Sequence, residues 1–160
     1  MRRAELAIAS LFLSGAAAAA EEVRYYAGVD FVSNYVASGV TQSMGRPAVQ
    51  PYFEVGKDGY YFGTWMSNVE FGNGDHAEID LYAGYRKIFA EKLFVDLSYA
   101  RYMYDSSGDC CGELRATVAF PLYESLAFKG YVAVNPGAGE ITRRATLAYE
   151  FTPKLGAAAH

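Results

Sequence analysis

The chain has 160 residues, including 16 glycines, 14 tyrosines and only 5 prolines, and 16% of its residues are aromatic. This composition is unusual for a helical domain and favours a single domain of short strands joined by glycine turns. The net charge of −4, with scattered lysines and arginines, argues against a nucleic-acid partner, which requires a concentrated basic surface.

The first twenty residues have the pattern of an export signal. Arg2 and Arg3 precede the apolar run Leu6–Ala20, which ends in small residues suited to cleavage. The run is shorter than the roughly 20 residues that a membrane-spanning helix needs. We therefore predict a signal peptide over residues 1–20 and a β-barrel domain over residues 21–160. Glu5, beside the run, leaves a membrane anchor as the alternative.

Eight segments of the mature chain alternate apolar and polar residues with a period of two, which indicates β-strands with two different faces. In chain order these segments are Val23–Tyr35, Ala48–Gly56, Tyr60–Met66, Glu78–Arg86, Leu93–Met103, Glu113–Phe120, Leu126–Val134 and Ile141–Phe151.

The stretch Tyr60–Arg86 shows the pattern most clearly, as two strands joined by a polar loop. In its second strand Ile79 and Leu81 fall on one face, and Glu78 and Asp80 fall on the other. Glycine, asparagine and aspartate occupy the loop, and these residues tolerate tight turns. The stretch is predicted to be a hairpin with one apolar and one charged face, and the later strands repeat it.

The connections between the predicted strands alternate between short and long. The short ones are Lys57–Gly59, Lys87–Lys92 and Pro121–Ser125, and the longer ones are Ser38–Arg46, Ser67–His76 and Tyr104–Gly112. Outer-membrane barrels have short periplasmic turns and longer outer loops. The order favours an all-β fold, an antiparallel up-and-down transmembrane β-barrel with about eight strands in this chain.

A soluble barrel and a membrane barrel use the two faces in opposite ways. The apolar face lines the interior of a soluble ligand carrier, whereas it meets lipid in a membrane barrel. Periodicity alone does not say which face points inward. Aromatic residues near strand ends favour the membrane barrel, because they resemble interfacial girdles. These residues are Tyr25, Tyr35, Tyr85, Tyr99, Phe120, Tyr149 and Phe151.

In the membrane barrel the charged face lines the lumen, and it mixes both signs of charge. The predicted lumen-lining residues are Asp30, Glu54, Glu78, Asp80, Arg86, Asp96, Glu113, Arg115, Lys129, Arg144 and Glu150. Because an isolated charge in a narrow lumen is expensive to desolvate, we expect the cations to form salt bridges with some of the carboxylates.

Four blocks of sequence carry a resemblance to a known family. They are Ser33–Ser43 (SNYVASGVTQS), Pro47–Gln50 (PAVQ), Gly63–Gly72 (GTWMSNVEFG) and Glu78–Tyr85 (EIDLYAGY). Together they resemble the TorF family of proposed porins, also called the Gcw_chp family of bacterial proteins of unknown function. The resemblance implies an outer-membrane location and a pore, with outer-membrane lipid and the barrel-assembly machinery as partners. It supplies no substrate and no catalytic residue.

The resemblance also implies strands beyond residue 160. The ending Thr152–Lys154 is a turn signal, and a further alternating segment begins after it. We therefore expect the chain to be a C-terminally truncated part of a larger barrel.

Other constellations carry weaker signals. Cys110 and Cys111 are placed in a long loop of an exported chain, where a vicinal disulfide is one alternative and an intermolecular pair another.

His76 lacks a second histidine nearby, so a loop histidine is favoured over a metal ligand. Gly72–Asp75 lacks the spaced carboxylates of a calcium loop. Glu78 and Asp80 have the pairing used in acid–base catalysis, but a polar lumen explains them more simply.

No nucleophile–base motif, phosphate loop or dinucleotide fingerprint is present, so neither an enzyme nor a cofactor is expected. The sequence favours an outer-membrane barrel that passes small solutes. Two alternatives stay open. One is a small structural or adhesion-type barrel with a closed lumen, and the other is a soluble periplasmic barrel that binds a ligand.

Overall fold

The computed structural model describes residues 22–89, 92–152 and 155–159, and these residues form strands and turns without an α-helix. The strands are β1 (Arg24–Val32), β2 (Val36–Ala37), β3 (Val40–Thr41), β4 (Ala48–Lys57), β5 (Tyr60–Asn68), β6 (Ala77–Ile88), β7 (Phe94–Tyr104), β8 (Gly108–Tyr123), β9 (Leu126–Asn135), β10 (Glu140–Thr152) and β11 (Leu155–Ala159). The predicted signal peptide, residues 1–20, lies outside the described residues, as do Pro153 and Lys154 of the predicted terminal turn. Within the described ranges no helix is long and apolar enough to cross a membrane.

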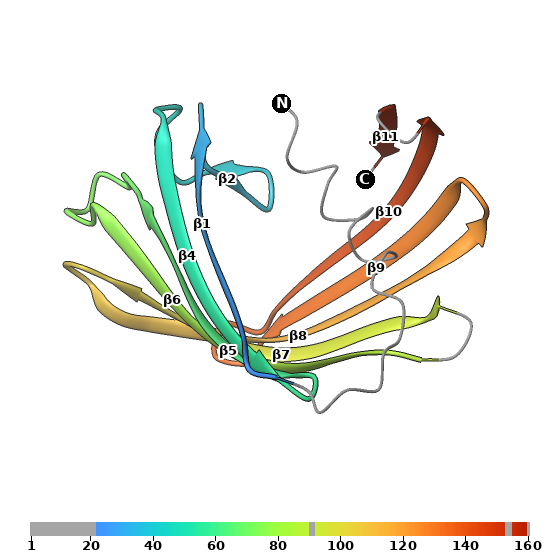
Figure 1. Ribbon diagram of the computed structural model, residues 1–160. Coiled ribbons are helices and arrows are strands. Elements are labelled where there is room, and N and C mark those ends of the chain that lie inside the picture. Colours follow the sequence, from blue (N-terminus) through green and yellow to red (C-terminus); the bar gives the residue numbers. More distant parts are fainter. Residues whose placement is uncertain (1–21, 90–91, 153–154, 160) are drawn as a thin grey trace.

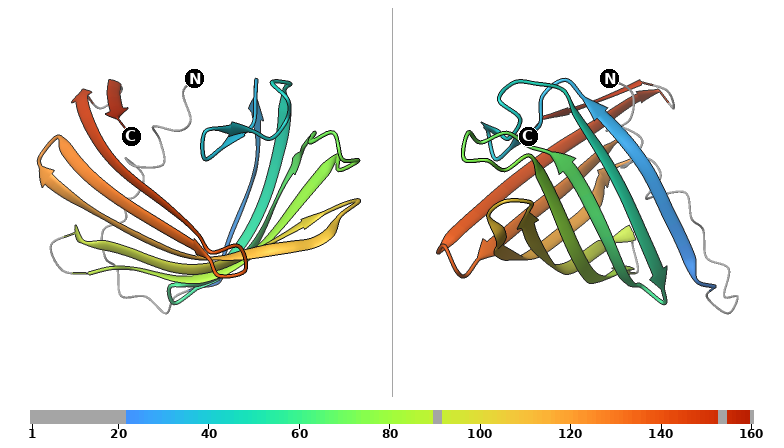
Figure 2. Two further views of the ribbon diagram at one scale, coloured as in Figure 1. Left: turned by 180° about the vertical axis from the view of Figure 1, so that it is seen from behind. Right: turned by 90° about the vertical axis from the view of Figure 1, so that its left-hand side faces the viewer.

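Eight long strands follow one another in an antiparallel meander. Their order in the sheet is β1-β4-β5-β6-β7-β8-β9-β10, and the short β11 adds a ninth strand beside β10. The sheet curls into an open trough, which Figure 1 shows from one end and Figure 2 from behind and from the side. Among the described residues β1 pairs only with β4, so the sheet is not closed into a barrel.

The eight predicted strands are confirmed, with β1 and β4 to β10 in their places. One predicted connection was wrong. The expected loop Tyr104–Gly112 is reduced to a turn between β7 and β8, because β8 begins at Gly108 and runs for 16 residues. Cys110 and Cys111 therefore lie on a strand and not in a long loop.

Turn chemistry fixes where adjacent strands begin and end. Asp58 and Gly59 have φ values of 55° and 87°, and Lys57 pairs with Tyr60 across them. An Asp-Gly pair with positive φ at both residues is the preferred two-residue hairpin, because its twist matches that of the strands. We call the end of the sheet that carries this turn the turn rim and the opposite end the loop rim.

The two faces of the trough differ sharply in polarity. Large apolar side chains on the convex face are exposed, among them Phe31, Tyr60 and Leu97. Buried residues are mostly polar: the described chain buries five hydrophobic residues but nine polar or charged ones. A protein that folds in water has the reverse distribution, because apolar burial drives its folding. The part of the chain that the structure describes therefore has no conventional apolar core.

Tyrosines cover glycines across the concave face. Gly63 pairs with Tyr82, and a Cβ on Gly63 would stand 2.4 Å from that ring. Gly84 pairs with Tyr61 in the same way, and a Cβ on Gly84 would stand 2.6 Å from that ring. An aromatic ring lying over a glycine replaces the missing side-chain packing and pins the register of the two strands. The glycines are thus required by the tyrosines beside them.

Candidate functional site

The structure places all eleven predicted charged residues on the concave face. The strand register establishes this, because residues that pair across neighbouring strands share a face, and so do residues two positions apart on one strand. Arg86 pairs with Asp96, and Asp30 pairs with Gln50, which contacts Ser67 on the next strand. The shared face follows from the period of two along every strand. What the residues do on this face differs from one group to the next.

Arg86 on β6 joins two carboxylates from different strands, Glu54 on β4 and Asp96 on β7. Its Nη2 lies 2.8 Å from Glu54 Oε2, and its Nε lies 3.5 Å from Asp96 Oδ2. The guanidinium also stacks 3.6 Å from the centre of the Tyr61 ring, whose hydroxyl donates to Asp96 Oδ1 at 2.6 Å. Four side chains from β4, β5, β6 and β7 thereby form one cluster, in which a single arginine bridges two carboxylates.

A second cluster forms around Arg115 on β8. Its Nε lies 3.2 Å from Glu113 Oε2, and its Nη2 donates to the Tyr102 hydroxyl on β7. That hydroxyl donates in turn to Glu113. The predicted salt bridges therefore exist for Arg86 and Arg115, where a tyrosine completes each group.

The remaining charged residues stand apart from these clusters. Within the described chain Asp30, Lys129 and Glu150 are exposed and form no ion pair. Arg144 lies 5.9 Å from the centre of the Tyr131 ring. The expectation that Lys129 and Arg144 reach a carboxylate was wrong.

Glu78 and Asp80 are, together with Glu54, the most buried carboxylates of the concave face. Glu78 is 3% exposed and Asp80 is 8% exposed. Glu78 Oε1 accepts from the Tyr104 hydroxyl at 3.2 Å, but Glu78 Oε2 and Asp80 Oδ1 have no hydrogen-bond partner among the described residues. Neither carboxylate takes part in an ion pair there.

A short hairpin covers these two carboxylates from the concave side. Residues 33–46, which include β2 and β3, fold back into the trough instead of extending from its rim, as Figure 1 shows for β2. Tyr35 of this inward hairpin packs edge-on against Trp65, with ring centres 5.4 Å apart. Tyr35 had been predicted to belong to an outer aromatic girdle, and that prediction was wrong.

The inward hairpin is held by a buried serine. Ser43 is 1% exposed, and its Oγ accepts from the Tyr35 N–H at 3.0 Å and donates to the Arg46 carbonyl at 2.7 Å. The Glu70 N–H donates to the Gln42 carbonyl at 2.8 Å, which ties the hairpin to the β5–β6 loop. The hairpin therefore has a defined position above the sheet.

A cavity of about 870 Å³ separates the inward hairpin from the sheet. Its walls include Tyr35, Trp65, Glu78, Asp80 and Tyr104. Arg86, Arg115 and Glu113 line the same cavity further along the sheet. The aromatic walls of this cavity were not predicted. The signal was in the sequence, because Trp65, Tyr102 and Tyr104 alternate onto the same face of their strands as the charged residues.

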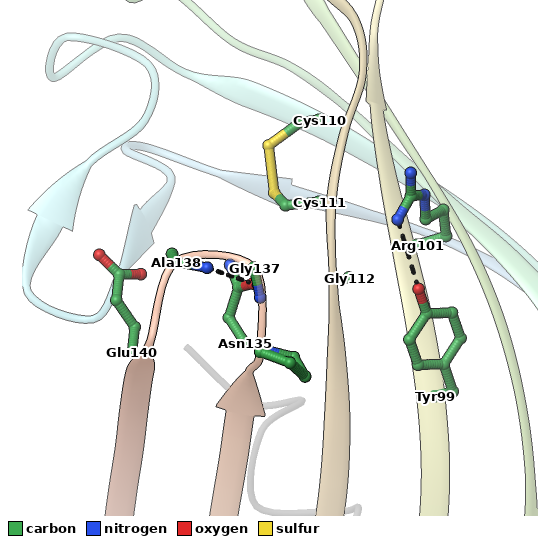
Figure 3. A pocket seen from close by; sticks show the side chains of 10 residues that line it. Tyr99, Arg101, Cys110, Cys111, Gly112, Asn135, Gly137, Ala138 and Glu140 are labelled. Carbon is green, nitrogen blue, oxygen red and sulfur yellow. Dashed lines mark hydrogen bonds between the residues drawn. A yellow bond between two sulfur atoms is a disulfide. The ribbon is translucent and has the colours of Figure 1, made fainter.

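A second cavity, of about 650 Å³, lies at the loop rim beside the two cysteines (Figure 3). Cys110 and Cys111 are joined by a disulfide, and the described residues contain no free cysteine. Asn135 Oδ1 accepts from the N–H groups of Gly137 and Ala138 at 3.1 and 3.2 Å and closes the β9–β10 turn. These hydrogen bonds hold the turn in place.

Asp75 links two loops of the loop rim. It accepts from the Ser107 hydroxyl at 2.6 Å, from the Ser107 N–H at 2.7 Å and from Asn73 Nδ2 at 2.8 Å. The Ser107 hydroxyl, followed by the backbone and Asn73 bonds, holds the pKa of Asp75 below its ordinary range despite its burial. Asp75 is therefore a structural latch between the β5–β6 loop and the β7–β8 turn.

His76 lies next to this latch, beside Glu70 of the same loop. Its Nδ1 is 3.5 Å from Glu70 Oε2. Across the described ranges no group of three or more histidine, cysteine, aspartate or glutamate residues is arranged to hold a metal ion.

Comparison with known protein families identifies the family of the chain. A family model described as "Bacterial protein of unknown function (Gcw_chp)" matches residues 16–135. The chain belongs to the Gcw_chp family. In this Gcw_chp protein the matched range includes β1 to β9 and therefore the inward hairpin and both arginine clusters. Neither the curated proteins nor the solved structures contain a match to the chain.

Proposed function

We propose that this Gcw_chp protein forms the wall of an outer-membrane β-barrel, a porin of the kind named TorF, through which small solutes pass. The observation that carries the proposal is the polarity of the two faces. Charged residues and their tyrosine partners occupy the concave side, while large apolar side chains stand exposed on the convex side. Barrels in lipid require this arrangement, and soluble carriers require the opposite one.

Pairs of aromatic rings near the turn rim give further support. Four pairs of rings lie there on the convex face, with centres 4.8 to 6.3 Å apart: Tyr25–Phe53, Tyr60–Tyr85, Phe120–Phe128 and Tyr149–Phe151. Tyr25, Tyr60 and Phe151 are each at least 60% exposed. We call these eight residues the aromatic belt. Aromatic side chains concentrate where a bilayer meets water, because their rings suit the headgroup region.

Strand length also fits a bilayer. Each of the eight long strands has between 9 and 16 residues. A tilted strand of about 9 to 11 residues crosses the hydrocarbon core. The proposal requires a partner for the free edge of β1, because unpaired backbone groups are not tolerated in lipid.

The test begins with the location of the full chain in a bacterial host. We expect it in the outer-membrane fraction, extracted only by detergent. Purified protein in liposomes should then admit a small neutral sugar while excluding a large dextran. Recovery in the periplasmic soluble fraction would contradict the barrel. Membrane insertion without sugar flux would favour the structural barrel with a closed lumen.

A further inference from the structure

Glu78 and Asp80 are buried carboxylates of the concave face that form no ion pair among the described residues. Arg86 is bound to Glu54 and Asp96, and Arg115 is bound to Glu113 and Tyr102. Arg115 also attracts Glu78 and Asp80 electrostatically, but it forms no ion pair with either. Two residues apart on one strand, the carboxylates lie about 7 Å from each other. Buried and this close, they require a compensating positive charge or a proton.

Aromatic rings surround the pair. In the strand register Asp80 lies between Trp65 on β5 and Tyr102 on β7, and Glu78 lies beside Tyr104. Tyr35 of the inward hairpin completes the group from above, packed against Trp65 and close to Glu78. Ring faces attract cations, most strongly where water is excluded. The carboxylate atoms Glu78 Oε2 and Asp80 Oδ1, which have no hydrogen-bond partner among the described residues, belong to side chains that line the cavity.

We call the part of the cavity lined by Glu78, Asp80 and the rings of Tyr35, Trp65, Tyr102 and Tyr104 the niche. We infer that this niche binds a small organic cation, a protonated or quaternary amine, as it passes along the concave face. The inference deepens the proposed function, on which it rests, by naming the class of solute. A hard metal ion is a poorer fit, because calcium takes six to eight oxygen ligands and the described residues offer no cluster of three candidate ligands. An ammonium group needs only the paired negative charge and the ring faces.

Trp65 makes the niche directly observable, because it is the one tryptophan in the chain. The folded full chain is titrated with choline chloride at constant ionic strength while the tryptophan emission is recorded. The matched control is 3,3-dimethylbutan-1-ol, which has the shape of choline without its charge. We expect a saturable response to choline, and at least roughly tenfold weaker binding of the alcohol. Potassium chloride should leave the emission unchanged.

Variants assign the response to the carboxylates. The double substitution Glu78→Gln with Asp80→Asn keeps the side-chain shapes and should weaken choline binding by at least roughly tenfold. Glu150→Gln removes one negative charge from the same face, at an exposed position outside the niche, and should leave choline binding unchanged. The comparison of choline with its neutral analogue uses only the wild-type protein, so it remains decisive if the double variant does not fold.

Three results would overturn the inference. An equal response to choline and the alcohol would identify an uncharged aromatic pocket, and an equal response to potassium would identify a site for inorganic cations. No response at all would mean that protons alone neutralise the pair. Sugar flux into liposomes is measured on the same preparation. Flux without a choline response rejects the cation niche and leaves the pore, whereas choline binding without flux rejects the pore and leaves the niche.

Discussion

An arginine placed on each face of the sheet gives the sharpest prediction about what those faces meet. Leu97 on β7 points to the convex side and is 57% exposed. Thr117 on β8 points to the concave side and pairs with Asp96, the residue next to Leu97. The two positions therefore lie at the same level of the sheet, so depth in a bilayer does not distinguish Leu97→Arg from Thr117→Arg.

The expected magnitudes differ because the two surroundings differ. An arginine that faces lipid near the bilayer centre costs about 2 to 4 kcal/mol, and the cost falls toward the interface. An arginine in a polar lumen costs much less, and at Thr117 it has Asp96 across the strand pair. If Leu97 instead faced water, Leu97→Arg would change the free energy of unfolding by only roughly 0.5 kcal/mol, as most substitutions at exposed positions do.

The assay is equilibrium unfolding by denaturant of the two variants and the wild type in phospholipid vesicles, extrapolated to zero denaturant. We expect Leu97→Arg to lower the free energy of unfolding by at least about 2 kcal/mol, and Thr117→Arg by less than about 1 kcal/mol. Equal losses at the two positions, or a larger loss at Thr117, would refute the orientation of the sheet.

Three further predictions concern packing, pH and the disulfide. Gly63→Ala should lower the free energy of unfolding by about 1 to 3 kcal/mol, because its Cβ meets the Tyr82 ring at 2.4 Å and the Phe53 carbonyl at 2.7 Å; a denaturant midpoint equal to that of the wild type would contradict this. The depressed pKa of Asp75 means that its stabilisation is present above the ordinary carboxyl value of 3.8 and is lost as the pH falls below it. Protease cleavage in the β5–β6 loop should therefore accelerate in acid, measured with an acid-active protease, and Asp75→Ala should remove that pH dependence. Reduction of Cys110–Cys111 should cost only about 1 kcal/mol by chain entropy, because the closed loop is minimal, and a large fall in melting temperature would disprove that estimate.

Local patterns predicted the strands and their faces well, because a period of two is a property of each strand alone. Glu78 and Leu81 were assigned to opposite faces from spacing, and the register confirms that assignment. The turn between β7 and β8 was harder to predict. Residues 104–112 are rich in turn-forming types, yet Asp105 accepts from the His76 and Ala77 N–H groups, and Asp75 binds Ser107. These contacts join distant segments and confine the turn, which allows β8 to begin early.

The residues that surround Glu78 and Asp80 could not be predicted from local sequence patterns, because they also come from distant segments. The carboxylates were identified from spacing, but their aromatic walls come from β5, β7 and the inward hairpin. Tyr35 lies 30 positions from Trp65 in the chain, and only the folded hairpin brings their rings together. Arg86 similarly meets Glu54 across an intervening strand. Pairing charges on a curved sheet requires knowledge of its register and curvature.

The measurement that tests the central claim most directly compares two adjacent residues of β8. Ala116 points to the convex side and Thr117 to the concave side, at the same depth. Ala116→Cys and Thr117→Cys are made in a chain with Cys110 and Cys111 replaced by serine, spin-labelled, and reconstituted in liposomes. We expect the label at position 116 to be accessible to oxygen dissolved in lipid and shielded from a water-soluble nickel chelate, and the label at position 117 to show the reverse. Accessibility of position 116 to the chelate, with position 117 shielded, would contradict the account.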